Sequence, residues 1–535
     1  MRSTDVSTDV LIIGSGVAGA LCAYRLAQKG IKVTILEAGP RIKREDIVTG
    51  FRNSPYLDLS AGYPNTPWAP RPDWGTGKDR YIEQIGHDVS AMEYLRLVGG
   101  TSWHWSANSI RLLPSDFQMH TTRSVGLDWP ISYSDLEPYY TEAEYEMGVS
   151  GDDSADTGSP RSKPYPNPPI PPSYSDRILS EKLRSLGMSF IARPAARNSR
   201  TYDGRSQCQG FGTCSPICPT GAQYSAMVHI QKAEKLGVEL IENARADRIN
   251  TDNHGRIVSV DYTHSDGTQG SATGKIVVVA ANGIETPRLL LMSASDEYPH
   301  GLANSSGEVG RNYMDHPGLS CRMLSPDPLY VDRGPESTIT SFTYRAGDFQ
   351  RERAAWTMSI YNRSFFHKTT LNSLREGVLP PDLDELIMYR SLHEVEFDVH
   401  LEQLPNHQNG ITLDWSKRDS AGQPVMRFHY SLGGYERNGL KFAQDIFWKI
   451  SNTLQSTETQ ISEAYSHHHL MGTTRMGDKP LTSVVDHECR THDHKNMFLL
   501  GSAVFPTCGT ANPTLTIAAL SLRAADHIKH QLMAD

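Results

Sequence analysis

The stretch Asp9-Val10-Leu11-Ile12-Ile13-Gly14-Ser15-Gly16-Val17-Ala18-Gly19 places a G-x-G-x-x-G turn directly after a short apolar run. Residues 21–28 continue as a helix that Gly30 ends, and Glu37 closes a second apolar run at 32–36. A strand, a glycine turn, a helix and a second strand with an acidic residue ~20 positions on are typical of dinucleotide binding. The glycines let the backbone approach a pyrophosphate, and Glu37 can bind a ribose hydroxyl. The motif does not separate FAD from NAD.

Later segments are predicted to complete the same unit, so the unit is discontinuous in sequence. The predicted elements are a strand at 275–280, a helix from 285 to 291, a strand at 496–500 and a helix from 513 to 531.

The middle of the chain, 320–455, is interpreted as an inserted α+β lobe that covers substrate, because it carries strand-like runs at 411–415 and 425–430. The proline-rich stretch 159–172 is predicted to be an extended surface arm.

Three of the seven cysteines form one tight cluster, Cys208, Cys214 and Cys218, with glycine and proline between them. The odd number and the clustering favour a metal site over a disulfide framework. Thiolates spaced in this way suit iron–sulfur ligation, and three buried thiols in a loop are the alternative. A flavin at the dinucleotide site would accept a hydride, and an iron–sulfur cluster passes electrons on one at a time. A chain with both groups is predicted to be an oxidoreductase that exports electrons.

Composition excludes several classes of protein. The chain has 535 residues, enough for two or three domains or one large two-lobed enzyme, and its net charge is −9 with no basic block, which argues against nucleic acid as a partner. No run of 18 or more apolar residues exists, so no membrane span is expected. The N-terminus shows neither a signal sequence nor a twin-arginine pair. The chain alone is expected in the cytoplasm, and export would require a partner's signal.

Motifs spread along the chain occur in a fixed order. They are Gly14 to Gly19 with Glu37-Ala38-Gly39; Val98-Gly99-Gly100-Thr101-Ser102-Trp103-His104-Trp105; Ala281-Asn282-Gly283-Ile284-Glu285-Thr286-Pro287; Val309-Gly310-Arg311-Asn312-Tyr313-Met314-Asp315-His316-Pro317; His469-Leu470-Met471-Gly472-Thr473-Thr474-Arg475-Met476-Gly477; and Gly509-Thr510-Ala511-Asn512-Pro513-Thr514-Leu515-Thr516. With these motifs the chain resembles the glucose–methanol–choline (GMC) flavoenzyme family along nearly its whole length. The resemblance implies an α/β fold, with a discontinuous Rossmann-like FAD-binding domain and an inserted α+β substrate domain.

Domain boundaries follow from this resemblance. We expect FAD-binding segments at 1–155, 226–319 and 456–535, the proline-rich arm and cysteine loop at 156–225, and the substrate domain at 320–455.

The segment 196–205, which leads into the cysteines, narrows the resemblance to the catalytic subunits of bacterial direct-electron-transfer sugar dehydrogenases, the FAD glucose and fructose dehydrogenase group. That group carries a 3Fe–4S cluster on a C-x5-C-x3-C pattern, which Cys208, Cys214 and Cys218 reproduce. The group often has a second cysteine directly after the first; here Gln209 takes that place.

The resemblance also assigns catalytic positions. His469 takes the place of the base that removes the substrate hydroxyl proton while hydride leaves to flavin N5, a task that suits a neutral imidazole. Asn512 takes the second position, where it would orient the hydroxyl; it is also a good N-cap ahead of Pro513. In extended chain, His467 would share a face with His469 and His468 would point away. The alternative for each is a structural or surface histidine.

Other residues are expected to hold the flavin. His104 corresponds to a histidine that is covalently bonded to the flavin in a pyranose-oxidising branch, the alternative being a ring packed nearby without a bond. Asp315-His316-Pro317 is interpreted as structural. The full cofactor set is Gly14, Gly16, Gly19, Glu37, Gly99, Gly100, Thr101, His104, Gly501, Pro513 and Thr514.

The leading hypothesis is an FAD- and iron–sulfur-dependent sugar or polyol dehydrogenase that passes electrons to a cytochrome or quinone. The alternatives are a pyranose-type oxidase using oxygen, a glycoside C3 dehydrogenase and, outside enzymes, an electron-transfer subunit. Ketoses, polyols and aldonates also occur as substrates among the relatives. By resemblance the partners would be a small chaperone-like subunit with a twin-arginine export signal and a multihaem cytochrome c, which would place the complex on the periplasmic face of the inner membrane.

Overall fold

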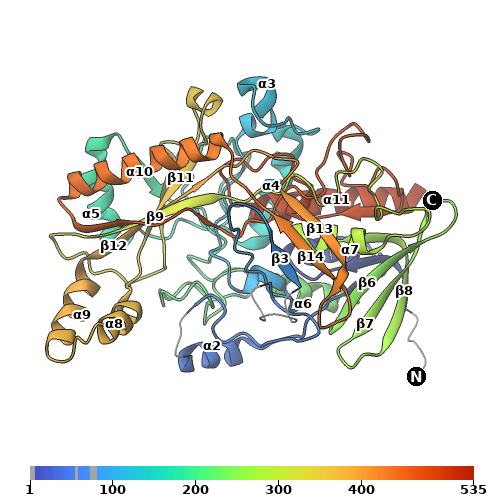
Figure 1. Ribbon diagram of the computed structural model, residues 1–535, viewed down its shortest axis with the longest axis horizontal. Helices are drawn as coiled ribbons and strands as arrows, with labels where there is room; N and C mark the ends of the chain where they lie inside the picture. The colour runs from blue at the N-terminus through green and yellow to red at the C-terminus, as the bar shows by residue number, and fades with distance from the viewer. Residues whose placement is uncertain (1–5, 55–57, 73–80, 535) are drawn as a thin grey trace.

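The computed structural model describes residues 6–54, 58–72 and 81–534. Two large sheets lie at opposite ends of the molecule (Figure 1). Within the described residues, no helix is long and apolar enough to span a bilayer.

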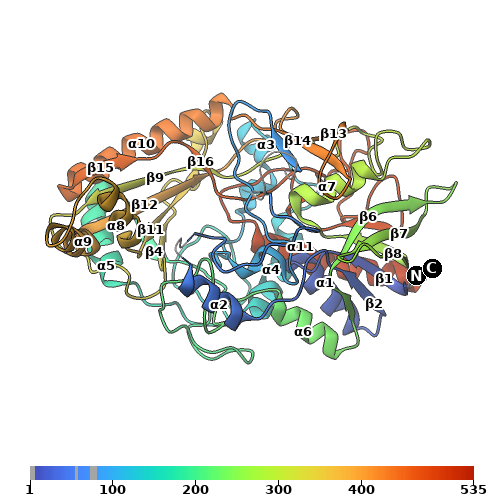
Figure 2. The same ribbon diagram turned by 60° about the horizontal axis from the view of Figure 1, so that its bottom comes forward.

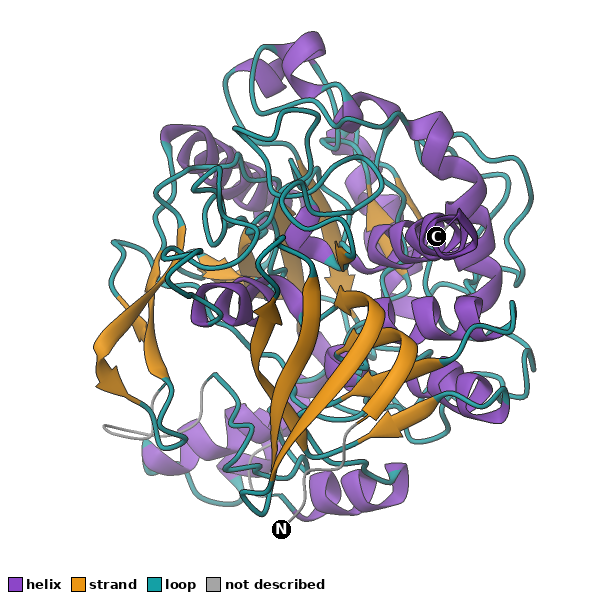
Figure 3. Cartoon of the chain, turned by 90° about the vertical axis from the view of Figure 1, so that its right-hand side faces the viewer, coloured by secondary structure: helices purple, strands orange, loops and turns teal. Residues whose placement is uncertain are grey.

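The first sheet is the expected dinucleotide-binding sheet. In the described chain it has seven strands in the order β5-β2-β1-β8-β7-β6, with β17 also paired to β8. Strands β5, β2, β1, β8 and β17 run parallel, and β6 and β7 form an antiparallel extension. The twisted strands face the viewer in Figure 3. The bounds are β1 Val6–Ile13, β2 Val33–Leu36, β5 Glu239–Ile241, β6 Ala244–Thr251, β7 Ile257–His264, β8 Gln269–Val279 and β17 Met497–Leu499.

Helices from distant parts of the chain cover this sheet. Helix α1 contacts α11 and α6, and α11 contacts α4, so the end of the chain packs against its beginning (Figure 2). The bounds are α1 Val17–Ala27, α4 Tyr133–Met147, α6 Met227–Lys235, α7 Asn282–Met292 and α11 Thr514–Ala534. The predicted discontinuous α/β fold is confirmed. The later elements end within three residues of the expected positions, except that β8 begins at Gln269, six residues before the expected strand start.

The second sheet has one apolar and one polar face. Its described strands follow the order β15-β9-β12-β11-β10-β4, with β16 also on β9. In β12, Val395, Phe397, Val399 and Leu401 share one core cluster with residues of helix α10. The alternating Glu394, Glu396, Asp398 and His400 point to the other face, because successive side chains of a strand alternate. The bounds are β4 Phe190–Ala192, β9 Pro317–Leu324, β10 Ile339–Ser341, β11 Trp356–Tyr361, β12 Glu394–Leu401, β15 Thr457–Ile461, β16 Tyr465–Ser466 and α10 Gly434–Leu454.

The expected hairpin in the middle of the chain belongs to a third, small sheet. Strands β13 (Gly410–Arg418) and β14 (Pro424–His429) pair with each other, and β14 also pairs in parallel with β3 (Ile82–Gln84). The second sheet, in turn, takes β4, β15 and β16 from outside 320–455. The division of the chain into five segments stays a prediction.

The remaining helical segments are short or peripheral. They are α2 Arg44–Asn53, α3 Met119–Arg123, α5 Tyr174–Leu183, α8 Phe366–Arg375 and α9 Asp382–His393, with 3-10 turns at Gly100–Trp103, Pro114–Phe117, Arg184–Leu186, Asp348–Arg351 and Ser502–Val504.

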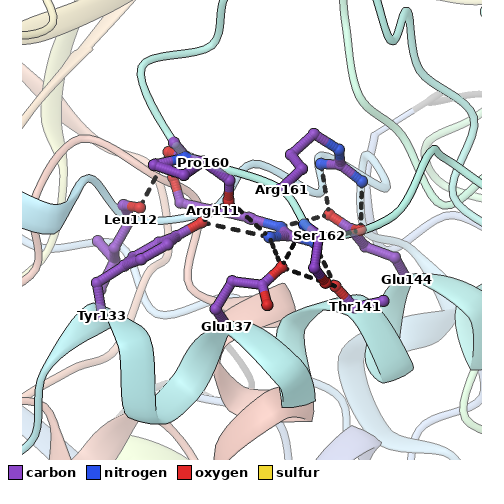
Figure 4. Close-up of polar contacts among 10 residues, drawn as sticks. Arg111, Leu112, Tyr133, Glu137, Thr141, Glu144, Pro160, Arg161 and Ser162 are labelled. Atoms are coloured by element: carbon purple, nitrogen blue, oxygen red, sulfur yellow. Dashed lines mark hydrogen bonds and ion pairs between the residues drawn. The ribbon is translucent and has the colours of Figure 1, made fainter.

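The start of the proline-rich arm is anchored to α4 by a buried ionic network (Figure 4). Arg111 is bound to both carboxylate oxygens of Glu144 at 2.8 Å and to Glu137 at 3.0 Å. Arg161 of the arm bonds the same Glu144, which is fully buried. The arm therefore lies on the surface but is held by charges that water does not screen.

Candidate active site

A cavity of about 1230 Å³ lies at the carboxyl ends of the parallel strands of the first sheet. Its walls include the residues that follow β1, β2, β8 and β17, which is where open α/β sheets bind ligands. Members of the predicted cofactor set that line it are Gly14, Gly16, Glu37, Gly100, Thr101, Gly501 and Thr514. Gly19, Gly99, His104 and Pro513 are not part of the wall.

The three motif glycines have different roles. Gly14 has φ +101°, and a Cβ on it would lie 2.6 Å from the carbonyl oxygen of Ala280. A Cβ on Gly19 would lie 2.0 Å from the carbonyl oxygen of Gly14, so this glycine allows α1 to pack against the turn. A Cβ on Gly16 would meet no protein atom within 4 Å. Gly16 therefore keeps open a space in the cavity beside the N-terminus of α1, where a pyrophosphate is favoured.

Glu37 is held in place by the glycine turn. Its Oε2 accepts from the backbone N–H of Ser15 at 3.0 Å and from the Ser15 hydroxyl at 2.6 Å, and its Oε1 accepts from the N–H of Gly39 at 2.9 Å. Burial raises the pKa of Glu37, while these hydrogen bonds oppose the rise. The carboxylate is thus fixed at the cavity wall, in the place expected for a ribose contact.

The two glycines of the second motif approach this turn closely. The N–H of Gly99 donates to the Ser15 hydroxyl at 3.0 Å, and a Cβ on Gly100 would lie 3.3 Å from the Cα of Gly16. Both have positive φ, +94° and +56°, which favours glycine.

Arg96 and Glu285 also line the cavity, and sequence reasoning did not select them. Glu285 Oε1 accepts from the Tyr94 hydroxyl at 2.5 Å, and its other oxygen lies 3.9 Å from Arg96. Glu285 belongs to the motif at 281–287, so the sequence could have indicated it as a site residue. No motif includes Arg96.

The proposed base and its partner are in contact. Asn512 Nδ2 donates to His469 Nε2 over 3.1 Å. Asn512 Oδ1 is buried and has no hydrogen-bond partner among the described residues. An unpartnered acceptor beside the base is suited to a second substrate hydroxyl, because the hydroxyl that reacts gives its only proton to the base.

His316 fixes the tautomer of His469. The carbonyl of Gly509 accepts from His316 Nε2 at 2.9 Å, so the proton of a neutral His316 is on Nε2. His316 Nδ1 then accepts from His469 Nδ1 at 2.7 Å, which leaves the lone pair of His469 on Nε2, facing Asn512. Burial lowers the pKa of His316 to about 4, and burial with the neighbouring imidazoles holds the pKa of His469 well below its usual value.

The structural interpretation of Asp315-His316-Pro317 was therefore incomplete, because His316 bonds directly to the proposed base. Asp315 supports both rings from the backbone side: its Oδ1 accepts from the N–H of His316 at 2.6 Å and of His469 at 2.9 Å.

The neighbours of His469 differ from the expected extended chain. His468 has φ +62°, which is not extended backbone. The ring of His468 bonds the carbonyl of Ala91, while the rings of His467 and His469 lie nearly parallel with centroids 6.3 Å apart. His467 and His469 do lie together, but the turn at His468 brings this about.

His104 is buried beside Tyr63, with ring centroids 5.7 Å apart. Burial lowers the pKa of His104 to about 4, and its Nδ1 donates to the carbonyl of Leu59 at 3.0 Å. The lone pair of the neutral ring is consequently on Nε2.

The cysteine loop forms a second cavity, of about 280 Å³, lined by Cys208, Cys214, Cys218 and Arg197. None of the seven cysteines, all of them in the described chain, forms a disulfide. The buried Arg197, whose Nε lacks a hydrogen-bond partner among the described residues, adds a positive charge to this cavity, which favours an anionic group.

Gln223 links the two cavities. Its Nε2 donates to the carbonyl of Cys214 at 3.2 Å and to that of Trp105 at 2.5 Å, and Trp105 lines the large cavity. The cysteine loop is therefore in hydrogen-bonded contact with the cofactor wall.

Comparison with known proteins agrees with this geometry. Family models described as GMC oxidoreductase match residues 178–318 and 405–521, and a model described as FAD dependent oxidoreductase matches 9–56. The chain is 40% identical to the fructose dehydrogenase large subunit of Gluconobacter japonicus, with 99% of each chain covered. It is 29% identical to the 2-methyl-1,2-propanediol dehydrogenase of Mycolicibacterium austroafricanum, covering 99% of this chain and 97% of that one.

The fold is shared with the crystal structure of pyridoxine 4-oxidase from Mesorbium loti, with a TM-score of 0.65, 17% identity, and 98% and 99% of the two chains covered. The family resemblance expected from the motifs is confirmed, and the cofactor left open by the glycine turn is FAD. The chain therefore belongs to the GMC oxidoreductase family and is an FAD-dependent oxidoreductase.

Proposed function

We propose that this chain is the catalytic subunit of a carbohydrate dehydrogenase that oxidises a carbinol group and exports the electrons through an iron–sulfur cluster. The single observation that carries the chemistry is the pair His469 and Asn512, with an unprotonated Nε2 and an unpartnered Oδ1 side by side. Similarity to a fructose dehydrogenase large subunit supports a sugar as substrate, with a ketose first among the candidates.

Each side chain has a defined task. His469 Nε2 accepts the proton of the substrate hydroxyl, the Asn512 amide nitrogen Nδ2 donates a hydrogen bond to the oxygen of that hydroxyl, and His316 keeps the second nitrogen of His469 protonated. FAD, when bound, supplies the hydride acceptor. We place FAD on Gly14, Gly16, Glu37, Gly100 and Thr101, with Gly501 and Thr514 also lining the cavity. Gly19 packs against Gly14, Gly99 bonds Ser15, and Pro513 directly precedes Thr514 at the start of α11.

His104 is proposed to carry the flavin covalently through Nε2. The support is its neutral, buried ring with Nδ1 fixed on a backbone carbonyl. The bond would prevent loss of the cofactor.

Cys208, Cys214 and Cys218 are proposed to ligate a 3Fe–4S cluster. The support is their common cavity, the buried Arg197 that lines it and the contact through Gln223 to the cofactor wall. A cluster there would supply one-electron transfer to an outside acceptor. The relative's designation as a large subunit supports a multisubunit assembly. We propose a small subunit with an export signal and a multihaem cytochrome c as partners, on the periplasmic face of the inner membrane.

The test is a substrate panel on the purified protein under anaerobic conditions. D-fructose, aldoses, polyols, aldonates and glycosides are each mixed with the protein, and flavin bleaching is followed, with a dye acceptor to measure turnover. Bleaching by a carbohydrate supports the proposal, and bleaching by none of them contradicts it. Reoxidation by cytochrome c rather than by air separates a dehydrogenase from an oxidase.

A further inference from the structure

A second histidine, His467, lies behind the proposed base and faces only acceptors. Its Nδ1 is 2.9 Å from the carbonyl oxygen of His316, and its Nε2 is 3.0 Å from Asp398 Oδ1. A carbonyl oxygen cannot donate, and neither can a carboxylate. An imidazole fills both positions with donors only when both of its nitrogens are protonated.

We propose that His467 is an imidazolium paired with the Asp398 carboxylate, and that its fixed positive charge is the positioning element that keeps His469 unprotonated and ready to act as a base. The inference rests on the proposed role of His469.

The surroundings of Asp398 favour the ionised form. Its second oxygen, Oδ2, accepts from the Tyr465 hydroxyl, so each carboxylate oxygen has a donor. Burial opposes the charge on each partner, yet the pKa of His467 is raised because of Asp398, and the pKa of Asp398 is lowered because of His467. The attraction between the partners therefore outweighs the burial of two charges.

Of the three imidazole rings that contact His469, His467 is the one whose charge acts on it. The rings of His316, His400 and His467 all lie near His469. The pKa of His316 is lowered to about 4 by burial, and that of His400 lies well below its usual value for the same reason, so both are neutral near pH 7. Only His467, of these three rings, carries a positive charge.

The titratable and charged groups around His467 come from several elements. Those beside it are Asp398 and His400 of β12, Asp315 and His316 before β9, and Tyr465 and His469 of its own segment, with His468 adjoining. Arg193 after β4 acts on His400, and Tyr361 of β11 acts on Tyr465.

A metal site is the competing explanation. Ligand atoms of Asp398, His400 and His467 lie within 4.8 Å of one another, and two histidines with a carboxylate can bind iron. Two of these atoms, however, are engaged in the hydrogen bond that defines the pair, and His400 Nε2 lies 2.9 Å from the Thr357 hydroxyl. Metal analysis of the purified protein is accordingly part of the test.

The decisive experiment is the pH dependence of flavin reduction in Asp398→Asn, measured anaerobically by stopped flow with the panel sugar that bleaches wild type fastest. The amide accepts from His467 or donates to it, so this variant removes both charges and preserves the shape. A unit charge 6.3 Å away shifts a pKa by up to about 2 units at an effective dielectric constant of about 20. Loss of the opposing carboxylate offsets part of this. The rate of flavin reduction falls at low pH as His469 becomes protonated. We expect this acid limb of the pH–rate profile to move up by about one pH unit in the variant.

His468→Asn is the matched control, because His468 adjoins the same segment, its Nδ1 bonds the backbone carbonyl of Ala91, and asparagine tolerates its positive φ. The Nε2 of His468 lies 3.9 Å from Glu93 Oε2, and its charge lowers the pKa of His469 less than that of His467 does. The acid limb of this variant should therefore move less than that of Asp398→Asn. If Asp398→Asn does not fold, His467→Gln and His467→Lys replace it: the lysine variant should keep the wild-type limb and the glutamine variant should shift it.

Other outcomes overturn the inference. If the acid limb of the pH–rate profile is unchanged in folded, FAD-loaded Asp398→Asn, then the His467–Asp398 pair is neutral or its charge does not affect the pKa of His469. Equal shifts in Asp398→Asn and His468→Asn mean general disruption, and stoichiometric metal that disappears in Asp398→Asn means a metal site. His469→Ala separates failure of the proposed function: if this variant reduces flavin at the wild-type rate, the base is elsewhere, whatever the state of His467.

Discussion

Replacing Gly16 by valine should empty the cofactor cavity without unfolding the protein. Gly16 has φ −66° and ψ −170°, ordinary extended backbone that any residue adopts. Because a Cβ at this position meets no protein atom within 4 Å, the new isopropyl group enters the cavity rather than the core. The loss of glycine's freedom in the unfolded chain stabilises such a variant by about 0.4–1 kcal/mol.

The effect on FAD should be much larger. A hydrogen bond from a backbone N–H to a charged phosphate contributes about 1.5–3 kcal/mol. Displacing the pyrophosphate from two such donors weakens binding by about 3–6 kcal/mol, or at least roughly 100-fold. The expected product is a folded, colourless protein.

Flavin absorbance per protein measures the loss of FAD. Circular dichroism and a thermal melt, compared with FAD-stripped His104→Ala, measure whether the fold is kept. Gly14→Val is the contrasting variant: with φ +101° and a Cβ 2.6 Å from the Ala280 oxygen, it should lose the fold as well as the flavin. A yellow Gly16→Val protein with wild-type FAD content would refute the placement of the pyrophosphate.

Four further results are expected. His469→Ala should slow flavin reduction by about 10²–10⁴-fold with FAD bound, and Asn512→Ala by about 10- to 100-fold, in anaerobic stopped flow. Cys214→Ser should lose iron and cytochrome reduction while substrate still bleaches its flavin; iron-free wild type from cluster-competent cells would end the cluster proposal. Acid precipitation should leave colour in the wild-type pellet and release it from His104→Ala, and full release from wild type would rule out the bond. Glu144→Gln leaves two arginines facing a neutral side chain and should cost about 3–5 kcal/mol of stability, seen in denaturant unfolding; an unchanged midpoint would contradict the role of the network.

Local signals predicted β1, β2, β8 and β17 of the first sheet, but not β5 or the antiparallel extension β6 and β7. The glycine turn predicted the positions of β1, α1 and β2, because each motif glycine meets a local requirement, either a positive φ or a close approach, of protein or cofactor, that leaves no room for a side chain. Strand β12 also had a readable signal, since Glu394 to Leu401 alternates polar and apolar residues over its whole length.

Contacts between distant segments could not be predicted in this way. His316 and His469 are 153 positions apart, and their hydrogen bond depends on how β9 and β16 pair. The hairpin β13–β14 was expected, but its sheet was not, because its partner β3 has only three residues and no periodic pattern. The pairing of Asp398 with His467 likewise depends on the polar face of the second sheet. The sequence alone does not show which segment lies against that face of β12.

The order of strands in the first sheet has a consequence for synthesis of the chain. Strand β1 has β2 on one side, which follows shortly, and β8 on the other, which begins at Gln269. At roughly 5–20 residues per second, a ribosome takes about 13–50 s to make the residues between Ile13 and Gln269. During that time one edge of a wholly apolar strand end, Val10 to Ile13, has no partner, and such edges pair readily with other chains. Nascent copies should therefore depend on a chaperone until β8 emerges, and arrest of translation before Gln269 should yield aggregates rather than a smaller folded domain.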